Sequence, residues 1–316
     1  MFLTTNVFSK LVMQNIYSLN MDGKELFKAW IANSNYQALR SPGYEFELMP
    51  YNLGELKNTL INDACKFSCS SLETAIGITK NVKISKSTAW ILIKLYYSAF
   101  YAAHSMLRMF GRSFSQIDPS YSRIIENNYL VFNAVPKKIE NGMYNFVLDE
   151  TRSTLTSQKY SDSHSDLWNV FYDLLQSLEN NIRDRSLVPI TNSELLLLTD
   201  YIQYLRKMLN KDSGAVKHNW LSIVRNNVNY QHQYGVWYPQ GSRFSNEKIL
   251  LISQKWNYDP IAIYKEKGLS DIEDFSLCCI SIVAMVSDIS RHLGRQISKK
   301  SCYKIVYSKL YEIVNV

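Results

Sequence analysis

The stretch KLYYSAFYAAH, residues 94–104, decides the fold that this sequence predicts. It lies within an apolar segment over residues 89–110 that stops at Gly111. The apolar residues of this segment fall on nearly all sides of a helix, and a helix that is apolar all round lies in the centre of a protein. Lys94, His104 and Arg108 interrupt the segment, and charges near the middle of a membrane span are costly. We therefore expect a buried central helix and no membrane span.

Helical periodicity extends from this segment over most of the chain. The hydrophobic fraction of 46% fits a packed globular protein, and only 11 Gly and 7 Pro interrupt its 316 residues. Few breakers favour long helices over a many-turned β protein. Further helices are expected over residues 24–38, 53–78, 163–178, 194–209, from 215 onward and over 273–293.

Two polar regions rich in turn residues, 112–162 and 233–270, are expected to be insertions with little regular structure, and the second can hold a small hairpin. We thus predict an all-α fold with three parts. Residues 1–55 form an N-terminal helical extension, residues 56–298 a helical domain with these two insertions, and residues 299–316 a helical tail.

The charge and the cysteines bear on partners and location. The formal charge is +7 and the pI about 8.9, which favours a phosphate-rich partner but also fits a soluble protein that binds no anion.

The five cysteines show no regular disulfide framework, as is typical of reduced thiols in the cytoplasm. Cys65 and Cys69 share a helix face, but no nearby His completes a zinc set, so we expect buried small residues. The N-terminus lacks a signal-peptide pattern, so we predict a cytoplasmic protein.

The standard catalytic motifs are absent from the sequence. It contains no P-loop, GxGxxG, GxSxG, HExxH or paired CxxC pattern. This excludes the common ATPases, dehydrogenases, α/β-hydrolases and zinc hydrolases that such motifs define. We expect neither a cofactor nor a metal.

The segment RNNVNYQH, residues 225–232, is the remaining candidate for chemistry. On a continuous helix, Arg225 and His232 point the same way, about 10 Å apart along the axis, with Asn229 between them. A guanidinium can stabilise the growing charge of a phosphodiester, and an imidazole can move a proton near neutral pH. Asn226 can orient either group. The set suits metal-free attack of a ribose 2′-hydroxyl on its own phosphate, although a solvated surface helix end stays an alternative.

The order of these segments resembles the HEPN superfamily (higher eukaryote and prokaryote nucleotide-binding domain). Residues 94–104 resemble the family's YYAxFxAA helix, and residues 163–168, SHSDLW, resemble the His-bearing start of its next helix. Residues 225–232 are similar to its R-x4-6-H signature. Residues 228–230 also resemble an R-x-x-A-D-Y variant, with Asn229 in the Asp position.

This resemblance, over residues 60–295, implies an antiparallel helical bundle and a metal-independent endoribonuclease. Such proteins commonly act as homodimers on RNA in toxin–antitoxin or antiphage defence, with an antitoxin or a companion defence protein. Carried over, it makes Arg225, His232 and Asn226 catalytic. The expected substrate-binding residues are Asn227, Asn229, Tyr230 and His104. The alternative is a non-catalytic HEPN-like module that binds RNA, a nucleotide or a partner protein.

The other aromatic and histidine residues have plainer expectations. Tyr96, Tyr97 and Tyr101 are expected in the core. His164 is expected at a helix start, in the cap region, and His218 and His292 on the surface.

Overall fold

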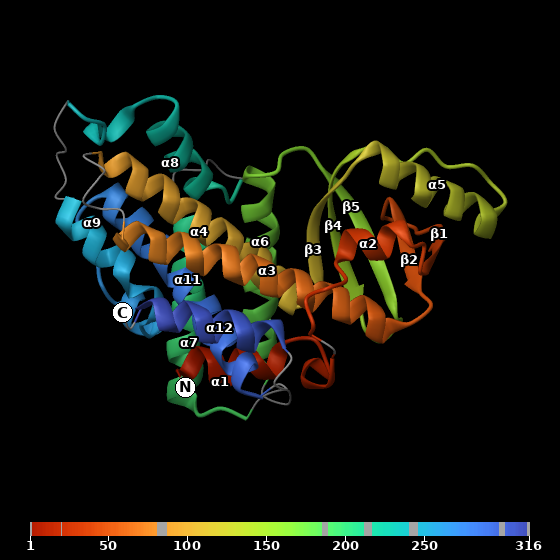
Figure 1. The fold of residues 1–316 in the computed structure, drawn as a ribbon, viewed down its shortest axis with the longest axis horizontal. Helices are drawn as coiled ribbons and strands as arrows, with labels where there is room; N and C mark the ends of the chain where they lie inside the picture. Colours follow the sequence, from red (N-terminus) through yellow and green to blue (C-terminus); the bar gives the residue numbers. More distant parts are fainter. Residues whose placement is uncertain are drawn as a thin grey trace.

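Helix α4 (Thr88–Met109) lies at the centre of a helical body, as the sequence predicts. The computed structural model describes residues 2–19, 21–80, 87–184, 189–211, 217–239, 246–296 and 301–314. In it, α4 packs against α3 (Leu53–Lys80), α6 (Ser165–Arg183), α8 (Trp220–Asn229) and α11 (Asp271–Gln296) (Figure 1). The helix ends where Gly111 takes a left-handed φ of +73°, a conformation that glycine adopts without steric cost.

Further helices complete the body around this centre. They are α1 (Leu3–Leu11), η1 (Ile16–Ser18), α7 (Asn192–Leu209), η3 (Gln233–Gly235), α9 (Asn246–Ser253), η4 (Gln254–Asn257), α10 (Pro260–Tyr264) and α12 (Cys302–Val314). Helix α7 begins with a capping box, in which the side chain of Thr191 accepts from the Glu194 N–H and the Glu194 carboxylate accepts from the Thr191 N–H. Both bonds satisfy amides that a helix start leaves free.

A five-stranded antiparallel sheet contradicts the all-α prediction. The strands are β1 (Tyr36–Leu39), β2 (Phe46–Pro50), β3 (Arg112–Ile117), β4 (Gly142–Asp149) and β5 (Thr154–Tyr160), in the order β1-β2-β5-β4-β3. Phe46 of β2 pairs with Ser157 of β5, so the N-terminal region and the first insertion form one sheet module (Figure 1). The insertion at 112–162 is therefore ordered, and the helix expected over residues 24–38 is only α2 (Phe27–Ala32), followed by β1.

Helices α2 and α5 (Pro119–Asn133) protect this sheet from solvent. Phe27 of α2 packs edge-on against Phe146 of β4, with 5.2 Å between ring centroids. From α5, Asn128 and Asn133 bond the outer backbone edge of β1: they accept from the N–H groups of Ala38 and Arg40 and donate to the carbonyls of Tyr36 and Ala38. These two side chains thus bond the backbone groups that a further strand would otherwise pair. This protects the edge, because an unpaired edge strand can associate with other chains.

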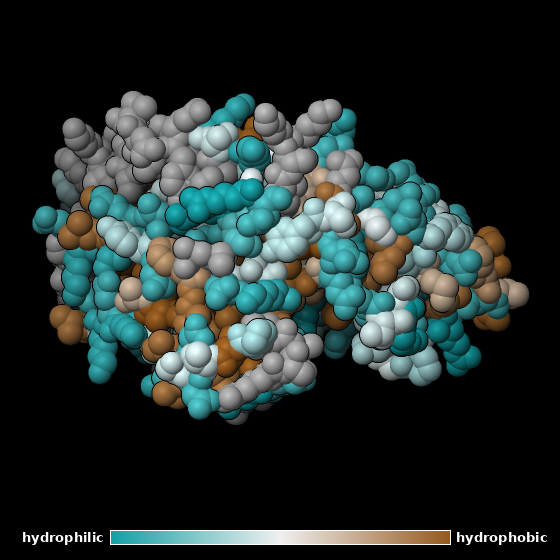
Figure 2. Space-filling model, turned by 90° about the horizontal axis from the view of Figure 1, so that it is seen from below, coloured by the Kyte–Doolittle hydropathy of each residue, from teal (hydrophilic) through white to brown (hydrophobic). Residues whose placement is uncertain are grey.

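The second insertion is helical where it is described. Its described residues form η3, α9, η4 and α10 and contain no hairpin. On the face shown in Figure 2, hydrophobic surface gathers at the right-hand end, which is the α5 end of the sheet module in Figure 1. Leu130, Val131, Phe132 and Val135 are exposed there.

None of the helices in the described ranges combines the length and the apolar character needed to cross a membrane.

Candidate functional site

Helix α8 carries Arg225 to the flank of the central helix α4. Its apolar face is buried, and the indole N–H of Trp237 donates to the carbonyl of Val228 at 2.7 Å, which satisfies one of the free carbonyls at the helix end. Nη2 of Arg225 donates to the Tyr97 hydroxyl at 2.5 Å, and Nη1 donates to Oδ1 of Asn226 at 2.8 Å. The expected support of Arg225 by Asn226 is thus present as a hydrogen bond.

The guanidinium of Arg225 is surrounded by phenol rings and has no acidic partner. Its central carbon lies 5.4 Å from the ring centroids of Tyr97 and Tyr230 and 5.7 Å from that of Tyr96. Arg225 is only 8% exposed. In the described part of the chain no carboxylate forms an ion pair with it, and its Nε has no hydrogen-bond partner. Burial opposes the charge, but the bond to Tyr97 and the neighbouring phenols outweigh it, so the pKa of Arg225 lies above its usual value.

His164 lies on the other side of the same tyrosines. The indole N–H of Trp168 donates to the Tyr96 hydroxyl at 3.2 Å, and this hydroxyl lies 3.1 Å from Nδ1 of His164. Which of these two groups donates depends on the tautomer of the imidazole. In the tautomer with its proton on Nε2, Nδ1 accepts from the Tyr96 hydroxyl. Burial and, next, the charge of Arg225 lower the pKa of His164, which favours the neutral imidazole.

His164 lies in the cap region of a helix, as the sequence predicts. The residue occupies the N-cap position of α6, but its side chain makes no capping bond. Its ring instead packs against Phe100 of α4, with 4.7 Å between centroids.

His232 reaches the neighbourhood of Arg225 by a different route from the predicted one. Helix α8 ends at Asn229, and His232 has a left-handed φ of 52°. The helix is therefore not continuous over residues 225–232 but breaks, which is the alternative that three asparagines in four positions indicate. The exposed imidazole stacks on Trp237, whose ring lies 5.3 Å from that of Trp90 on α4. Trp90 and Tyr97 lie two turns apart on one face of α4, about 10 Å along the axis, so His232 and Arg225 lie along the same flank of α4 beside different residues.

The other expected substrate-binding residues divide between this flank and the interior. Tyr230 is 68% exposed beside Arg225. Asn227 donates to the Tyr234 hydroxyl at 3.5 Å, and Asn229 is the half-buried last residue of α8. His104 lies elsewhere, because it is 6% exposed and stacks on Phe67 at 4.8 Å.

His104 belongs to a closed network around Arg108. Nη1 of Arg108 donates to Nδ1 of His104 at 3.2 Å, and Nη2 donates to the Ser115 hydroxyl of β3 at 3.0 Å. Nε faces the Asp63 carboxylate at 3.3 Å. Burial and the charge of Arg108 hold the pKa of His104 well below its usual value. The network joins α3, α4 and the sheet, so we assign His104 to the structure of the fold and not to the site at Arg225.

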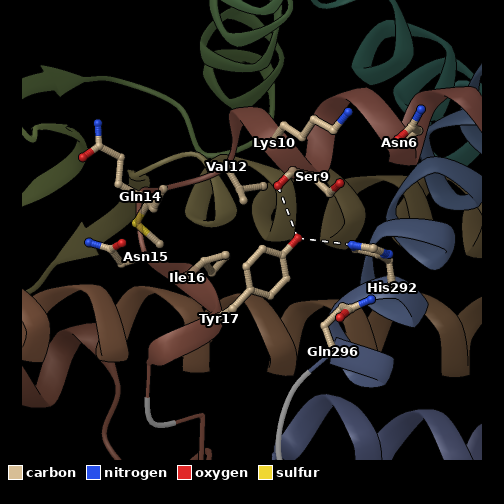
Figure 3. A pocket seen from close by; sticks show the side chains of 11 residues that line it. Asn6, Ser9, Lys10, Val12, Gln14, Asn15, Ile16, Tyr17, His292 and Gln296 are labelled. Carbon is tan, nitrogen blue, oxygen red and sulfur yellow. Dashed lines mark hydrogen bonds between the residues drawn. The ribbon is translucent and has the colours of Figure 1, made fainter. Parts of the chain in front are cut away.

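A cavity lies at the end of the helical body that is remote from the Arg225 site. It has a volume of about 430 Å³ and opens between α1, η1 and the end of α11 (Figure 3). In it the Tyr17 hydroxyl lies 3.2 Å from Nε2 of His292 and 3.4 Å from the Ser9 carbonyl oxygen. His292 is thus a partly buried lining residue and not a free surface residue. The cavity is lined by amide side chains and by the exposed Lys10. None of these lining residues is a buried charge without a partner, and in this the cavity differs from the Arg225 site.

Two residues of the Arg225 site were not expected there. Tyr97 was predicted to be a core residue, and His164 a cap, yet both lie against Arg225 or its tyrosines. The phenol pair at residues 96 and 97 is visible in the sequence. What no local pattern indicates is that α6 and α8, distant in sequence, both contact this part of α4.

The ligand chemistry of the site is that of an anion. Among the described residues, no group of three or more His, Cys, Asp or Glu side chains is arranged to hold a metal ion. Arg225 instead offers N–H donors, one of them unused, and the surrounding phenols and amides offer neutral hydrogen bonds. A guanidinium in such surroundings fits a phosphate or carboxylate group.

Comparisons with known proteins identify no relative. No family model matches this chain, and no curated protein or solved structure matches it either. The HEPN resemblance stays a prediction from sequence motifs.

Proposed function

We propose that this chain is a metal-independent endoribonuclease that holds an RNA phosphodiester at Arg225. The observation that carries the proposal is a buried guanidinium with only uncharged partners. Removing a charge from water is costly unless a partner compensates for it. A bound phosphodiester supplies that counterion.

The tyrosines around Arg225 support a nucleic-acid ligand. Aromatic side chains stack on bases of single-stranded RNA without strong sequence preference. The exposed ring of Tyr230 stands beside the guanidinium, so a base can stack on it while the adjacent phosphate contacts Arg225. Asn227 and Asn229 offer amide groups at the same end of α8. A single-stranded or loop RNA fits this arrangement best.

The two histidines suit different parts of the reaction. In the proposed step the ribose 2′-oxygen attacks the phosphorus, a new P–O bond forms and the bond to the 5′-oxygen breaks. The exposed His232 takes the 2′-hydroxyl proton or returns one to the leaving oxygen. The neutral His164 donates from Nε2 to a phosphoryl oxygen while Arg225 stabilises the added charge.

A homodimer with facing α8 ends would bring further groups to this site. His232 is exposed and stacks on Trp237, whereas Arg225 of the same chain bonds to Tyr97. An imidazole from a second protomer can therefore complete the set. A regulatory antitoxin or a companion defence protein would act by covering the same surface.

A second candidate function is RNA or nucleotide binding without cleavage. The same separation between imidazole and guanidinium favours it, because proton transfer needs contact at hydrogen-bond distance. Arg225 and the tyrosines would then bind the nucleic acid, and no product would form.

Cleavage of labelled single-stranded RNA in EDTA tests these proposals. The nuclease proposal expects product from the wild type and at least a 100-fold loss for Arg225→Gln and His232→Ala, with a smaller loss for His164→Gln. Arg295→Gln, at an exposed arginine of α11, is the matched control and should cleave normally. Salt-sensitive binding without product supports the second candidate. Full activity of Arg225→Gln removes the site assignment.

A further inference from the structure

Three cysteines gather where the C-terminal helix α12 meets α3 (Figure 1). Cys65 and Cys69 lie one turn apart on α3, and Cys302 is the first residue of α12. Cys65 and Cys302 are near enough for each thiol to shift the pKa of the other. All three are free thiols. The pair expected to be two buried small residues is thus part of a thiol cluster between two helices.

The backbone around Cys302 holds its side chain against α3. The Cys302 N–H donates to the Met21 carbonyl at 2.7 Å. Gly23 is packed so closely that a Cβ there would lie 3.3 Å from the Cβ of Cys302. Gly23 is itself fixed to α3, because its N–H donates to Oδ1 of Asn62 at 3.0 Å. Cys302 therefore has little freedom to move away from Cys65.

The three thiols differ in their readiness to ionise. The neighbouring Cys65 thiol lowers the pKa of Cys302, and the N–H groups of Tyr303 and of Cys302 itself add to this effect against burial and the charge of Asp22. The neighbouring Cys302 and burial raise the pKa of Cys65. Burial and the neighbouring Glu73 raise the pKa of Cys69 to about 11. Because the thiolate is the nucleophile, Cys302 reacts first.

We propose that Cys302 is a peroxide-reactive thiol and that its oxidation ends in a Cys65–Cys302 disulfide. In the first step the Cys302 thiolate attacks hydrogen peroxide, an S–O bond forms, the O–O bond breaks and hydroxide leaves to become water. In the second step the Cys65 sulfur attacks the Cys302 sulfenic acid, the S–S bond forms and the S–O bond breaks. The proton of Cys65 leaves with the oxygen as water. Peroxide accepts the two electrons that the two sulfurs lose.

This disulfide would fasten α12 to the hub of the helical body. Tyr303, next to Cys302, is 2% exposed, and its hydroxyl approaches Ser68 of α3 and Ser105 of α4. Its carbonyl oxygen lies 3.3 Å from the position of a Cβ on Gly294 of α11. A bond between Cys65 and Cys302 closes a loop over most of the chain and so restricts the unfolded state strongly. A bond between Cys65 and Cys69 would lie within one helix and leave α12 unrestrained.

Mass spectrometry of the full chain after brief peroxide treatment tests the proposal. After alkylation and non-reducing digestion, we expect an intramolecular Cys65–Cys302 peptide. The melting temperature should rise by about 10 °C and return with dithiothreitol. The cross-link should persist in Cys69→Ser. Cys65→Ser should instead leave a sulfenic acid at Cys302, which dimedone traps.

Two results would overturn the proposal. One is alkylation of both Cys65 and Cys302 after oxidation. The other is a Cys65–Cys69 peptide as the main product. If the serine variant at the buried Cys65 does not fold, the rate of iodoacetamide alkylation of each thiol in the reduced wild type still decides. Cys302 should then be labelled at least about tenfold faster than Cys69, and equal labelling of the two contradicts the assignment.

Discussion

Arg108 on α4 and Arg225 on the neighbouring α8 differ in what compensates for their burial. Arg108 is 2% exposed and faces the Asp63 carboxylate at 3.3 Å. Arg225 is 8% exposed and bonds only to the neutral groups of Tyr97 and Asn226. The difference teaches that burial alone does not mark a functional arginine. The missing carboxylate is the feature that distinguishes the proposed binding site at Arg225 from the structural network at Arg108.

The two clusters are neighbours, which makes the contrast sharper. Phe100 of α4 packs against His104 of the first cluster at 4.8 Å and against His164 of the second at 4.7 Å. Both clusters therefore combine an arginine, a histidine and the same aromatic helix. Only the Arg108 cluster includes a residue of the sheet, Ser115 of β3.

Loss of the arginine should have its largest effect on stability at Arg108. Arg108→Gln leaves Asp63 without its cationic partner, so we expect the free energy of unfolding to fall by about 3–5 kcal/mol. Arg225→Gln removes a charge that has no anionic partner and should change stability by less than about 1 kcal/mol. Urea unfolding followed by circular dichroism measures both. Equal losses in the two variants would break the comparison.

Adding a carboxylate beside Arg225 and removing the carboxylate beside Arg108 should make each cluster resemble the other. Asn226→Asp gives Arg225 an acidic partner at the position of the present 2.8 Å hydrogen bond, and we expect RNA binding to weaken about tenfold with no loss of stability. Asp63→Asn removes the partner of Arg108 and should cost about 2 kcal/mol of stability. Fluorescence anisotropy and urea unfolding check the two effects. RNA binding by Asn226→Asp at wild-type strength would contradict the prediction.

The smallest expected effect is on the pH dependence of stability. The pKa values of His104 and His164 are lowered in the folded chain, so below about pH 6.5 the unfolded chain binds more protons. The free energy of unfolding should therefore fall as the pH is lowered from 7 to 5. His104 contributes at most about 1.4 kcal/mol per pH unit. His104→Gln should flatten the profile relative to wild type, and an unchanged profile would contradict the prediction.

A titration of His164 tests the electrostatic effect of Arg225. The charge of Arg225 helps to lower the pKa of His164, so Arg225→Gln should raise that pKa, as measured by an NMR titration of the imidazole. An unchanged titration would show that Arg225 does not act on His164.

The helical body could be predicted from the sequence, but the sheet could not. Residues 53–78 and 273–293 show strong helical periodicity and coincide with α3 and α11. The strand β5 reads TLTSQKY, and its neighbour β2 lies about a hundred residues earlier in the chain. Short polar strands resemble loops because their partners come from distant sequence. Nothing local indicates that Phe46 and Ser157 pair.

The candidate site could be predicted only in its local part. Side chains at adjacent helix positions do not face each other, so the hydrogen bond between Arg225 and Asn226 does not follow from a continuous helix. The three asparagines among residues 226–229 do indicate a break, and the helix ends before His232. Tyr97 and His164 join the site through the packing of α4, α6 and α8, which a single sequence does not show.

Salt-dependent binding of a non-cleavable RNA tests the central claim, that the counterion of Arg225 is a phosphodiester. The probe is a labelled single strand whose 2′-hydroxyls are replaced by 2′-deoxy groups, so that binding is measured without cleavage. Arg225→Gln should weaken binding at least about tenfold and lower the slope of log affinity against log salt by about one. Arg295→Gln serves as the control. Equal affinity and equal slope in wild type and Arg225→Gln would contradict the account.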